Sequence, residues 1–250
     1  MRMQLKIILL LVTLIPTTGW TRSAWYEIEI IVFNYTSKAA LQAEYWDKNP
    51  GQPEQKNVMF LVDPKAYQAA GGRQDTLLKL SENQLKLRDV KKIIQNSSEY
   101  EILFHESWRQ LIHPREQAKT LYIQSEQTIP VVLNTASRSG TSQNRGKPVL
   151  EGTIKLSLSR FIHASIDLVY SARNPQFDPS AAMRLTESAT SPLNNTQPNA
   201  DVIAEKEPEF LQYRIQQRRR MTSKQLHYID HPKVGILIEA WAYGAGGNEN

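Results

Sequence analysis

The sequence predicts an α+β fold in which a mainly antiparallel sheet carries one well-defined helix packed on a face. Three observations lead to this fold class. Apolar and polar residues alternate over several segments, as they do in half-buried strands. Only one segment combines a capping signal with an apolar helical repeat. Strands and helices do not alternate regularly along the chain, which argues against a parallel sheet.

The first 23 residues have the pattern of a secretory signal peptide. Arg2 and Lys6 precede an apolar run over residues 7–15, and small residues follow. The run is too short to cross a bilayer, which takes about 20 residues. We expect cleavage within Gly19–Ala24 and no membrane span afterwards, with an uncleaved anchor as the alternative.

The composition of the 250-residue chain excludes several kinds of functional site. It contains no cysteine, which excludes disulfides, thiolate metal sites and a cysteine nucleophile. Its formal net charge of +5 falls to about +2 without Arg2, Lys6 and Arg22 of the leader. This charge is too small to support nucleic-acid binding through bulk electrostatics.

The first half of the chain is expected to supply four strands. Apolar and polar residues alternate over residues 25–33, and the end of this segment is fully apolar. Residues 58–62 are expected to form a short buried strand. Pro64 begins a helical turn after the second strand. Residues 100–110 and 121–124 are the next two strands.

The clearest helix is expected between Ser81 and Asn96. Ser81 and Gln84 have the spacing of a capping box. Leu87, Val90 and Ile94 repeat at helical spacing behind it, and Asn96 is a suitable stop. We expect this helix to cover one face of the sheet.

The longest regular pattern covers residues 150–170, where the apolar residues are even-numbered. A single straight strand of this length would measure about 70 Å, too long for a domain of this size. We therefore expect a tight turn or a bulge near residues 160–163. Residues 210–221 and the segment from Val234 onward return to strand character.

Residues 172–208 lose all periodicity and hold five prolines. This composition is typical of a disordered insertion. We expect a single α+β domain made of residues 24–171 and 209–243, which this insertion separates in the sequence.

Catalytic signatures are absent from the sequence. It has no Gly-x-Ser-x-Gly elbow, Gly-rich phosphate loop, Ser-x-x-Lys or His-Glu-x-x-His. We therefore expect no enzyme activity, no catalytic residue, no metal and no cofactor. Glu27 with Glu29, or Glu101 with Glu106, could still meet across a sheet as a glycosidase pair.

Two arginines stand at the ends of predicted strands, on the same face as the apolar residues before them. Arg160 shares parity with Leu158, and Arg219 shares parity with Ile215. Each guanidinium needs an acidic partner or a bound anion, because burying it unpaired is costly. The alternatives are an internal salt bridge, for instance to Asp230 or Glu239, or a ligand.

Residues 218–232 gather three arginines, two histidines, a tyrosine and an aspartate. His227 and His231 have the spacing of metal ligands on a helix, but Pro232 leaves little helix, so we expect their rings to hydrogen-bond the backbone. His163 lies beside an aromatic residue and Arg160. The candidate ligand-binding residues are Arg160, His163, Arg219, Arg220, His227 and Tyr228.

Four motifs follow one another over nearly the whole mature chain. They are Trp25 to Phe33 after the leader, His105-x-x-Trp108-Arg109-Gln110, Leu150-Glu151-Gly152-Thr153 with Arg160 to His163, and Arg219-Arg220-Met221 with Leu226 to Pro232 and Gly235. In these motifs the chain resembles the CsiV family of periplasmic peptidoglycan-binding proteins, and Phe161 stands where the family often has Tyr.

The resemblance implies a non-enzymatic periplasmic protein that binds peptidoglycan and supports wall synthesis. In the family this support acts through a lipoprotein activator of a bifunctional penicillin-binding synthase. The resemblance supplies no established ligand residues. A wall hydrolase with paired carboxylates and an envelope interaction factor that binds no glycan are the alternatives.

Overall fold

The structure is a computed structural model that describes residues 23–36, 50–69, 75–131, 146–180 and 208–244. The expected leader therefore lies outside the described residues except for Ser23. The strands are β1 (Ala24–Tyr35), β2 (Val58–Val62), β3 (Thr76–Leu78), β4 (Tyr100–Ile112), β5 (Thr120–Gln124), β6 (Thr128–Ile129), β7 (Lys147–Pro148), β8 (Leu150–Leu158), β9 (Ile162–Arg173), β10 (Phe210–Met221), β11 (His227–His231) and β12 (Val234–Ala242). The helices are α2 (Pro64–Ala69), the 3₁₀ turn η1 (Glu82–Gln84) and α3 (Arg88–Gln95).

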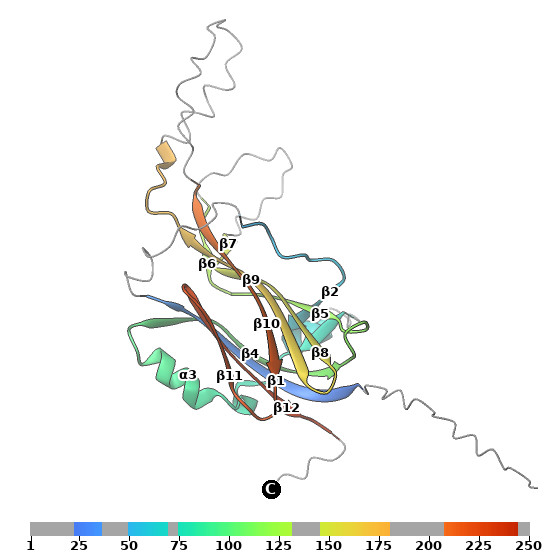
Figure 1. Ribbon diagram of the computed structural model, residues 1–250. Coiled ribbons are helices and arrows are strands. Elements are labelled where there is room, and N and C mark those ends of the chain that lie inside the picture. Colours follow the sequence, from blue (N-terminus) through green and yellow to red (C-terminus); the bar gives the residue numbers. More distant parts are fainter. Residues whose placement is uncertain (1–22, 37–49, 70–74, 132–145, 181–207, 245–250) are drawn as a thin grey trace, which may run out of the picture.

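The predicted fold class is confirmed: the molecule is mainly antiparallel β structure with α3 packed on a sheet face (Figure 1). The strands form two principal sheets instead of the one expected. A four-stranded sheet has the order β11-β12-β1-β4, and a six-stranded sheet has the order β10-β9-β8-β5-β2-β3. A strand in which apolar and polar residues alternate has one apolar face. Two sheets with such faces remove them from water by packing against each other.

The core fills the space between these two sheets. Ile30 of β1 and Ile238 of β12 belong to the same buried cluster as Leu156 of β8 and Ile166 of β9. A second cluster lies on the opposite face of the four-stranded sheet. There Ile31 and Phe33 of β1 pack against Leu87, Val90 and Ile94 around α3. The molecule is thus a sandwich with a helix on the outside of its smaller sheet.

The hairpin of β8 and β9 confirms the expected turn within residues 150–170. Leu158 pairs with Ile162, and residues 159–161 form the connection. The even-numbered apolar residues face the core, as Ile154 opposite Ile166 illustrates. Odd-numbered residues of β8 and β9 therefore lie on the outer face of the six-stranded sheet.

The helix behind the capping box is shorter than expected. The box at Ser81 and Gln84 exists, but it closes the 3₁₀ turn η1, after which Leu85 is extended. Helix α3 begins only at Arg88. Its start depends on Glu29 of β1, whose carboxylate accepts hydrogen bonds from the amides of Lys86 and Leu87. This partner is distant in sequence, and no local pattern reveals it.

Two further expectations need correction. Strand β2 is only partly buried, since Met59 is buried whereas Phe60 is exposed. The expected insertion of residues 172–208 is too wide at both ends, because β9 continues to Arg173 and Asn174 hydrogen-bonds Pro208 and Glu209. Residues 181–207 lie outside the described residues. Among the described residues, no helix has the length and apolar character needed to cross a membrane.

Candidate functional site

Three consecutive arginines end β10, which is an edge strand of the six-stranded sheet. Arg218 pairs with Ser165 and Arg220 with His163, so these two arginines share the outer face. Arg219 pairs with the buried Ala164 and shares the core face, as its parity predicts. All three side chains are exposed, because β10 ends at the border of the sheet.

These arginines border a pocket of about 510 Å³ at the β8–β9 turn. Residues 114–116, which follow β4, form the wall opposite the β10 arginines. The end of β8 and the start of β9 lie between the two walls. The lining residues are Pro114, Arg115, Glu116, Ser157, Leu158, Ser159, His163, Ala164, Ser165, Arg218, Arg219 and Arg220. We call this space the arginine pocket.

Positive charge dominates the arginine pocket. Its lining has four guanidiniums and a single carboxylate, that of Glu116. Within the described ranges, none of the four arginines is in an ion pair with a carboxylate. Arg109, Arg173 and Arg214, by contrast, pair with Glu27, Glu209 and Asp167. Guanidiniums bind carboxylates and phosphates through paired hydrogen bonds, so the pocket is suited to an anion.

The floor of the arginine pocket adds a hydroxyl and an imidazole group. The imidazole Nε2 of His163 lies 3.1 Å from the hydroxyl of Ser159. Phe161 supports two arginines, with the guanidinium of Arg220 4.7 Å and that of Arg160 5.6 Å from its ring centre. Hydroxyl and imidazole groups can hydrogen-bond an amide or a sugar beside an anion.

A second hollow of about 820 Å³ adjoins the arginine pocket, because Ser165 and Arg218 line both. Its lining is polar, with Thr153, Lys155 and Gln216 on the sheet and Glu54 and Lys56 above it. We call it the polar hollow. Both spaces lie on the outer face of the six-stranded sheet, and we call the two together the groove.

Arg214 fixes the segment that walls the polar hollow. Its guanidinium donates to the carbonyl of Pro50 at 3.0 Å and to both carboxylate oxygens of Asp167 at 2.8 Å. The hydrogen bonds from Arg214 lower the pKa of Asp167, against the opposing effect of burial. This arginine therefore has a structural partner, unlike its three neighbours at the end of β10.

The predicted site residues divide into separate groups. His163, Arg219 and Arg220 come together in the arginine pocket. Arg160 lies in the adjoining turn and does not line it. Sequence reasoning left out Arg218, although it begins the same arginine run. It also missed Arg115, which follows the end of a strand and carries no sequence signal.

His227 and Tyr228 lie away from the arginine pocket, on β11 of the four-stranded sheet. His227 is buried, and its Nε2 accepts the amide proton of Thr222 at 3.0 Å. The ring of His231 accepts the amide proton of Lys233 at 3.3 Å. The prediction that both rings hydrogen-bond the backbone is confirmed.

Tyr228 belongs to a cluster on the face that carries α3. Its hydroxyl and that of Tyr35 contact each other, and both donate to Asp230 Oδ1 at 2.8 Å. These bonds, led by the one from Tyr228, lower the pKa of Asp230. Asp230 is thus no partner of Arg219. Glu239 is not a partner of Arg219 either. Its carboxyl group lies near Glu29 and Lys86, whose charges shift its pKa in opposite directions.

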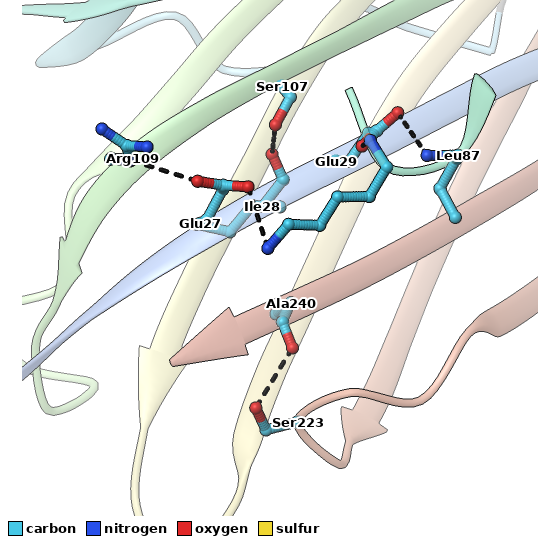
Figure 2. A network of polar contacts seen from close by, with 9 residues as sticks. Glu27, Ile28, Glu29, Leu87, Ser107, Arg109, Ser223 and Ala240 are labelled. Carbon is cyan, nitrogen blue, oxygen red and sulfur yellow. Dashed lines mark hydrogen bonds and ion pairs between the residues drawn. The ribbon is translucent and has the colours of Figure 1, made fainter. Parts of the chain in front are cut away.

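The candidate glycosidase carboxylates have other partners. Figure 2 shows the guanidinium of Arg109 pointing at the carboxylate of Glu27. The Arg109 guanidinium and the Lys86 ammonium each lie 3.1 Å from this carboxylate. Glu29 is fully buried and accepts from the amides of Lys86 and Leu87 at 2.7 and 3.1 Å. On β4, Glu106 pairs with Lys79, and Glu101 accepts from Asn34 at 3.4 Å.

Comparison with known proteins gives one family. The family described as "Peptidoglycan-binding protein, CsiV" matches residues 4–241. No curated protein matches the chain. Among solved structures, a type II secretin from enteropathogenic Escherichia coli, GspD, is 9% identical with a TM-score of 0.31, over 90% of this chain and 71% of that one. That likeness is too weak to carry an argument.

Proposed function

Because the chain belongs to the CsiV family of peptidoglycan-binding proteins, we propose that it binds peptidoglycan through the groove formed by the arginine pocket and the polar hollow. One observation carries the choice of site. Four guanidiniums meet there without an ion pair inside the described part of the chain. Peptidoglycan stem peptides present carboxylates, which such guanidiniums bind by paired, charge-assisted hydrogen bonds.

The remainder of the groove supports the same ligand. Hydroxyl groups of Ser157, Thr153 and Ser165 and the amide of Gln216 line it. These groups can hydrogen-bond the amides of a stem peptide and the N-acetyl groups of a glycan. Arg160, in the turn beside the pocket, and His227 and Tyr228, on β11, remain proposed contacts.

Binding, and not cleavage, is the activity that these side chains favour. A glycosidase needs one carboxyl group free to protonate the leaving group and another facing the sugar ring. Glu27 is instead held by Arg109 and Lys86, and Glu29 by a histidine and two backbone amides. Figure 2 shows the contacts of Glu27 with Arg109 and of Glu29 with Leu87. The pair Glu101 and Glu106 is engaged with Asn34 and Lys79.

We further propose that the protein acts in the periplasm and supports wall synthesis through a lipoprotein activator of a bifunctional penicillin-binding synthase. The periplasmic location is supported by the leader-like residues 1–23. The partner proteins rest on the family resemblance. Sedimentation of the purified activator with wall sacculi, with and without this protein, tests the partnership. An activator that sediments equally in both cases contradicts it.

Pelleting of isolated sacculi tests the binding site. The wild-type protein should sediment with sacculi, and Arg219→Ala or Arg220→Ala should weaken binding about tenfold, the effect of losing one charge-assisted contact. Arg88→Ala is the matched control, because Arg88 is an exposed arginine on α3. Binding should also fall as salt rises.

Three results would contradict the proposal. Wild-type protein that stays in the supernatant would exclude wall binding. Variants that are folded by thermal melting and bind as tightly as wild type would place the site elsewhere. Soluble muropeptides released from the sacculi would favour the hydrolase alternative.

A further inference from the structure

We infer that one end of the sandwich binds the surface of an anionic membrane, without spanning it. This end consists of the start of β1, the end of β12 and the connections formed by residues 113–119, 159–161 and 222–226. We call it the leader end, because the leader-like residues 1–22 directly precede it. The inference goes beyond the proposed function and does not depend on it.

Strand pairing places these five segments at the same end. The start of β1 lies opposite the end of β4 and the end of β12, and the end of β10 lies opposite the start of β9. The amide of Leu158 on β8 donates to the carbonyl of His113 at 2.8 Å, which joins the two sheets there. The amide of Lys224 donates to the carbonyl of Ala240 on β12 at 2.9 Å. In Figure 1 the start of β1, the end of β12 and the β8–β9 turn lie on one side of the molecule.

Large apolar side chains are exposed on three segments of the leader end. Trp25 is 49%, Tyr243 45% and Leu226 39% exposed. Trp25 and Tyr243 are neighbours, since the amide of Tyr243 donates to the carbonyl of Trp25 at 2.8 Å. Tryptophan and tyrosine are enriched at membrane–water interfaces, where an amphipathic ring reaches both the headgroups and the acyl chains. A leucine adds an apolar group that can enter the same layer.

Positive charge accompanies these apolar groups. The three connections carry Arg115, Lys119, Arg160 and Lys224 next to the arginine run of β10, and Glu116 is the only carboxylate in these segments of the sequence. Arg160 and Lys224 are exposed, and within the described ranges neither is in an ion pair with a carboxylate. Anionic phospholipids attract basic residues that lie close to the membrane surface. Charge and exposed aromatic groups thus favour the same partner.

The leader enters the fold at this end. Residues 7–15 are the apolar run that export places in the membrane, and Ser23 is the first described residue before β1. The leader end is therefore the part of the folded domain nearest to the membrane for as long as the leader is attached. This position favours a lipid surface over an acidic protein as the partner.

Vesicle flotation tests the inference. The mature protein is purified after cleavage of the leader, so that the leader itself cannot bind lipid. Vesicles of phosphatidylethanolamine and phosphatidylglycerol are compared with vesicles of neutral phosphatidylcholine. The protein should bind the anionic vesicles at least about tenfold more tightly, because each exposed cation adds to the attraction. Added salt should weaken this binding.

Matched variants locate the contact. Leu226→Ser should weaken binding to the anionic vesicles about fivefold, and Lys224→Glu about tenfold or more. Ile93→Ser and Lys92→Glu are the controls, because both residues are exposed on α3 and the changes in side chain and charge are comparable. Both controls should float as the wild-type protein does, and thermal melting checks that every variant is folded.

The outcomes separate this inference from the proposed function. Equal binding of both kinds of vesicle, or no binding of either, overturns the inference, and so do controls that lose as much binding as the variants of the leader end. Loss of flotation in Arg219→Ala, with Leu226→Ser unaffected, also overturns it and assigns the headgroup to the arginine pocket. Leu226 does not line the groove, so Leu226→Ser should still pellet with sacculi. Loss of sacculus binding by the wild-type protein contradicts the proposed function and leaves the vesicle result standing.

Discussion

The carboxylate of Glu29 lies 2.7 Å from Nε2 of His105, and neither side chain is open to solvent. The two residues lie on neighbouring strands, β1 and β4. Glu29 also accepts from the amides of Lys86 and Leu87, directly before α3. One carboxylate thus joins the four-stranded sheet to the start of its covering helix.

Replacing Glu29 with Ala should destabilise the protein strongly. The change leaves His105 and two backbone amides without their acceptor in a buried site, which costs about 3–5 kcal/mol. Urea unfolding measures the loss. Glu82→Ala is the control, because this carboxylate is 81% exposed and pairs with Lys91 at 3.6 Å. The control should lose less than about 1 kcal/mol, and equal losses would contradict the role given to Glu29.

Gly235→Ala should also destabilise the protein, for a steric reason. A Cβ atom at this position would meet the ring of Phe33 at 2.3 Å. Phe33 is buried under α3 and cannot move freely, so overpacking should cost about 1–3 kcal/mol. Thermal melting checks this, and the double variant Phe33→Leu/Gly235→Ala should recover part of the loss. If the double variant loses the sum of both effects, the two positions are not in conflict.

Asp167→Asn should lower stability at neutral pH by about 1–2 kcal/mol, a modest cost because the pair with Arg214 is partly exposed. The pKa of Asp167 is lowered by Arg214, so its stabilisation is present above the ordinary value of 3.8. It is lost as the pH falls through the lowered value of the folded state. Urea midpoints of both proteins should therefore converge below about pH 4. A constant difference down to pH 2 would refute this linkage.

Glu239→Gln should raise the stability at neutral pH, in contrast to Asp167→Asn. Burial, followed by the charge of Glu29, raises the pKa of Glu239 above its ordinary value of 4.5. The ionised carboxylate therefore costs stability at neutral pH, and this cost disappears below the ordinary value. The melting temperature should rise at pH 7 by up to about 2–4 °C, and the two proteins should agree near pH 4. A lower melting temperature at pH 7 would show that Glu239 is stabilising.

Deleting residues 181–207 through a short Gly/Ser linker should preserve a cooperative melt, whereas deleting 172–208 should not. The wider deletion removes Asn174, whose side chain donates to Pro208 at 2.9 Å and whose amide donates to Glu209 at 3.1 Å. The narrower deletion keeps both bonds, and the entropy of closing a loop changes only slowly with its length. Loss of the cooperative transition in the narrower variant would contradict this boundary.

Local patterns in the sequence were sufficient for the longer strands, but not for the short strands β3, β6, β7 and β11. Even-numbered apolar residues predicted the β8–β9 hairpin, because side chains alternate along a strand. The start of α3 could not be predicted, since its acceptor Glu29 lies 57 residues before Lys86. The division of β structure into two sheets was missed for the same reason, because pairing between distant strands leaves no local signal.

The candidate site was predicted only in part, and the cause is a change of sheet. Arg219 and Tyr228 are nine positions apart, but β10 belongs to the six-stranded sheet and β11 to the four-stranded one. Proximity in sequence therefore did not place them on one face. His163 joined the arginines because β9 and β10 pair directly, with His163 opposite Arg220.

The position of Arg218, Arg219 and Arg220 on an edge strand has a consequence for encounters between copies of the protein. An exposed edge is a template for pairing with another strand, and repeated charge is one way in which proteins prevent this. Two copies that approached through β10 would bring six guanidiniums together. The same charge that makes the pocket positive therefore opposes the pairing of two β10 edges.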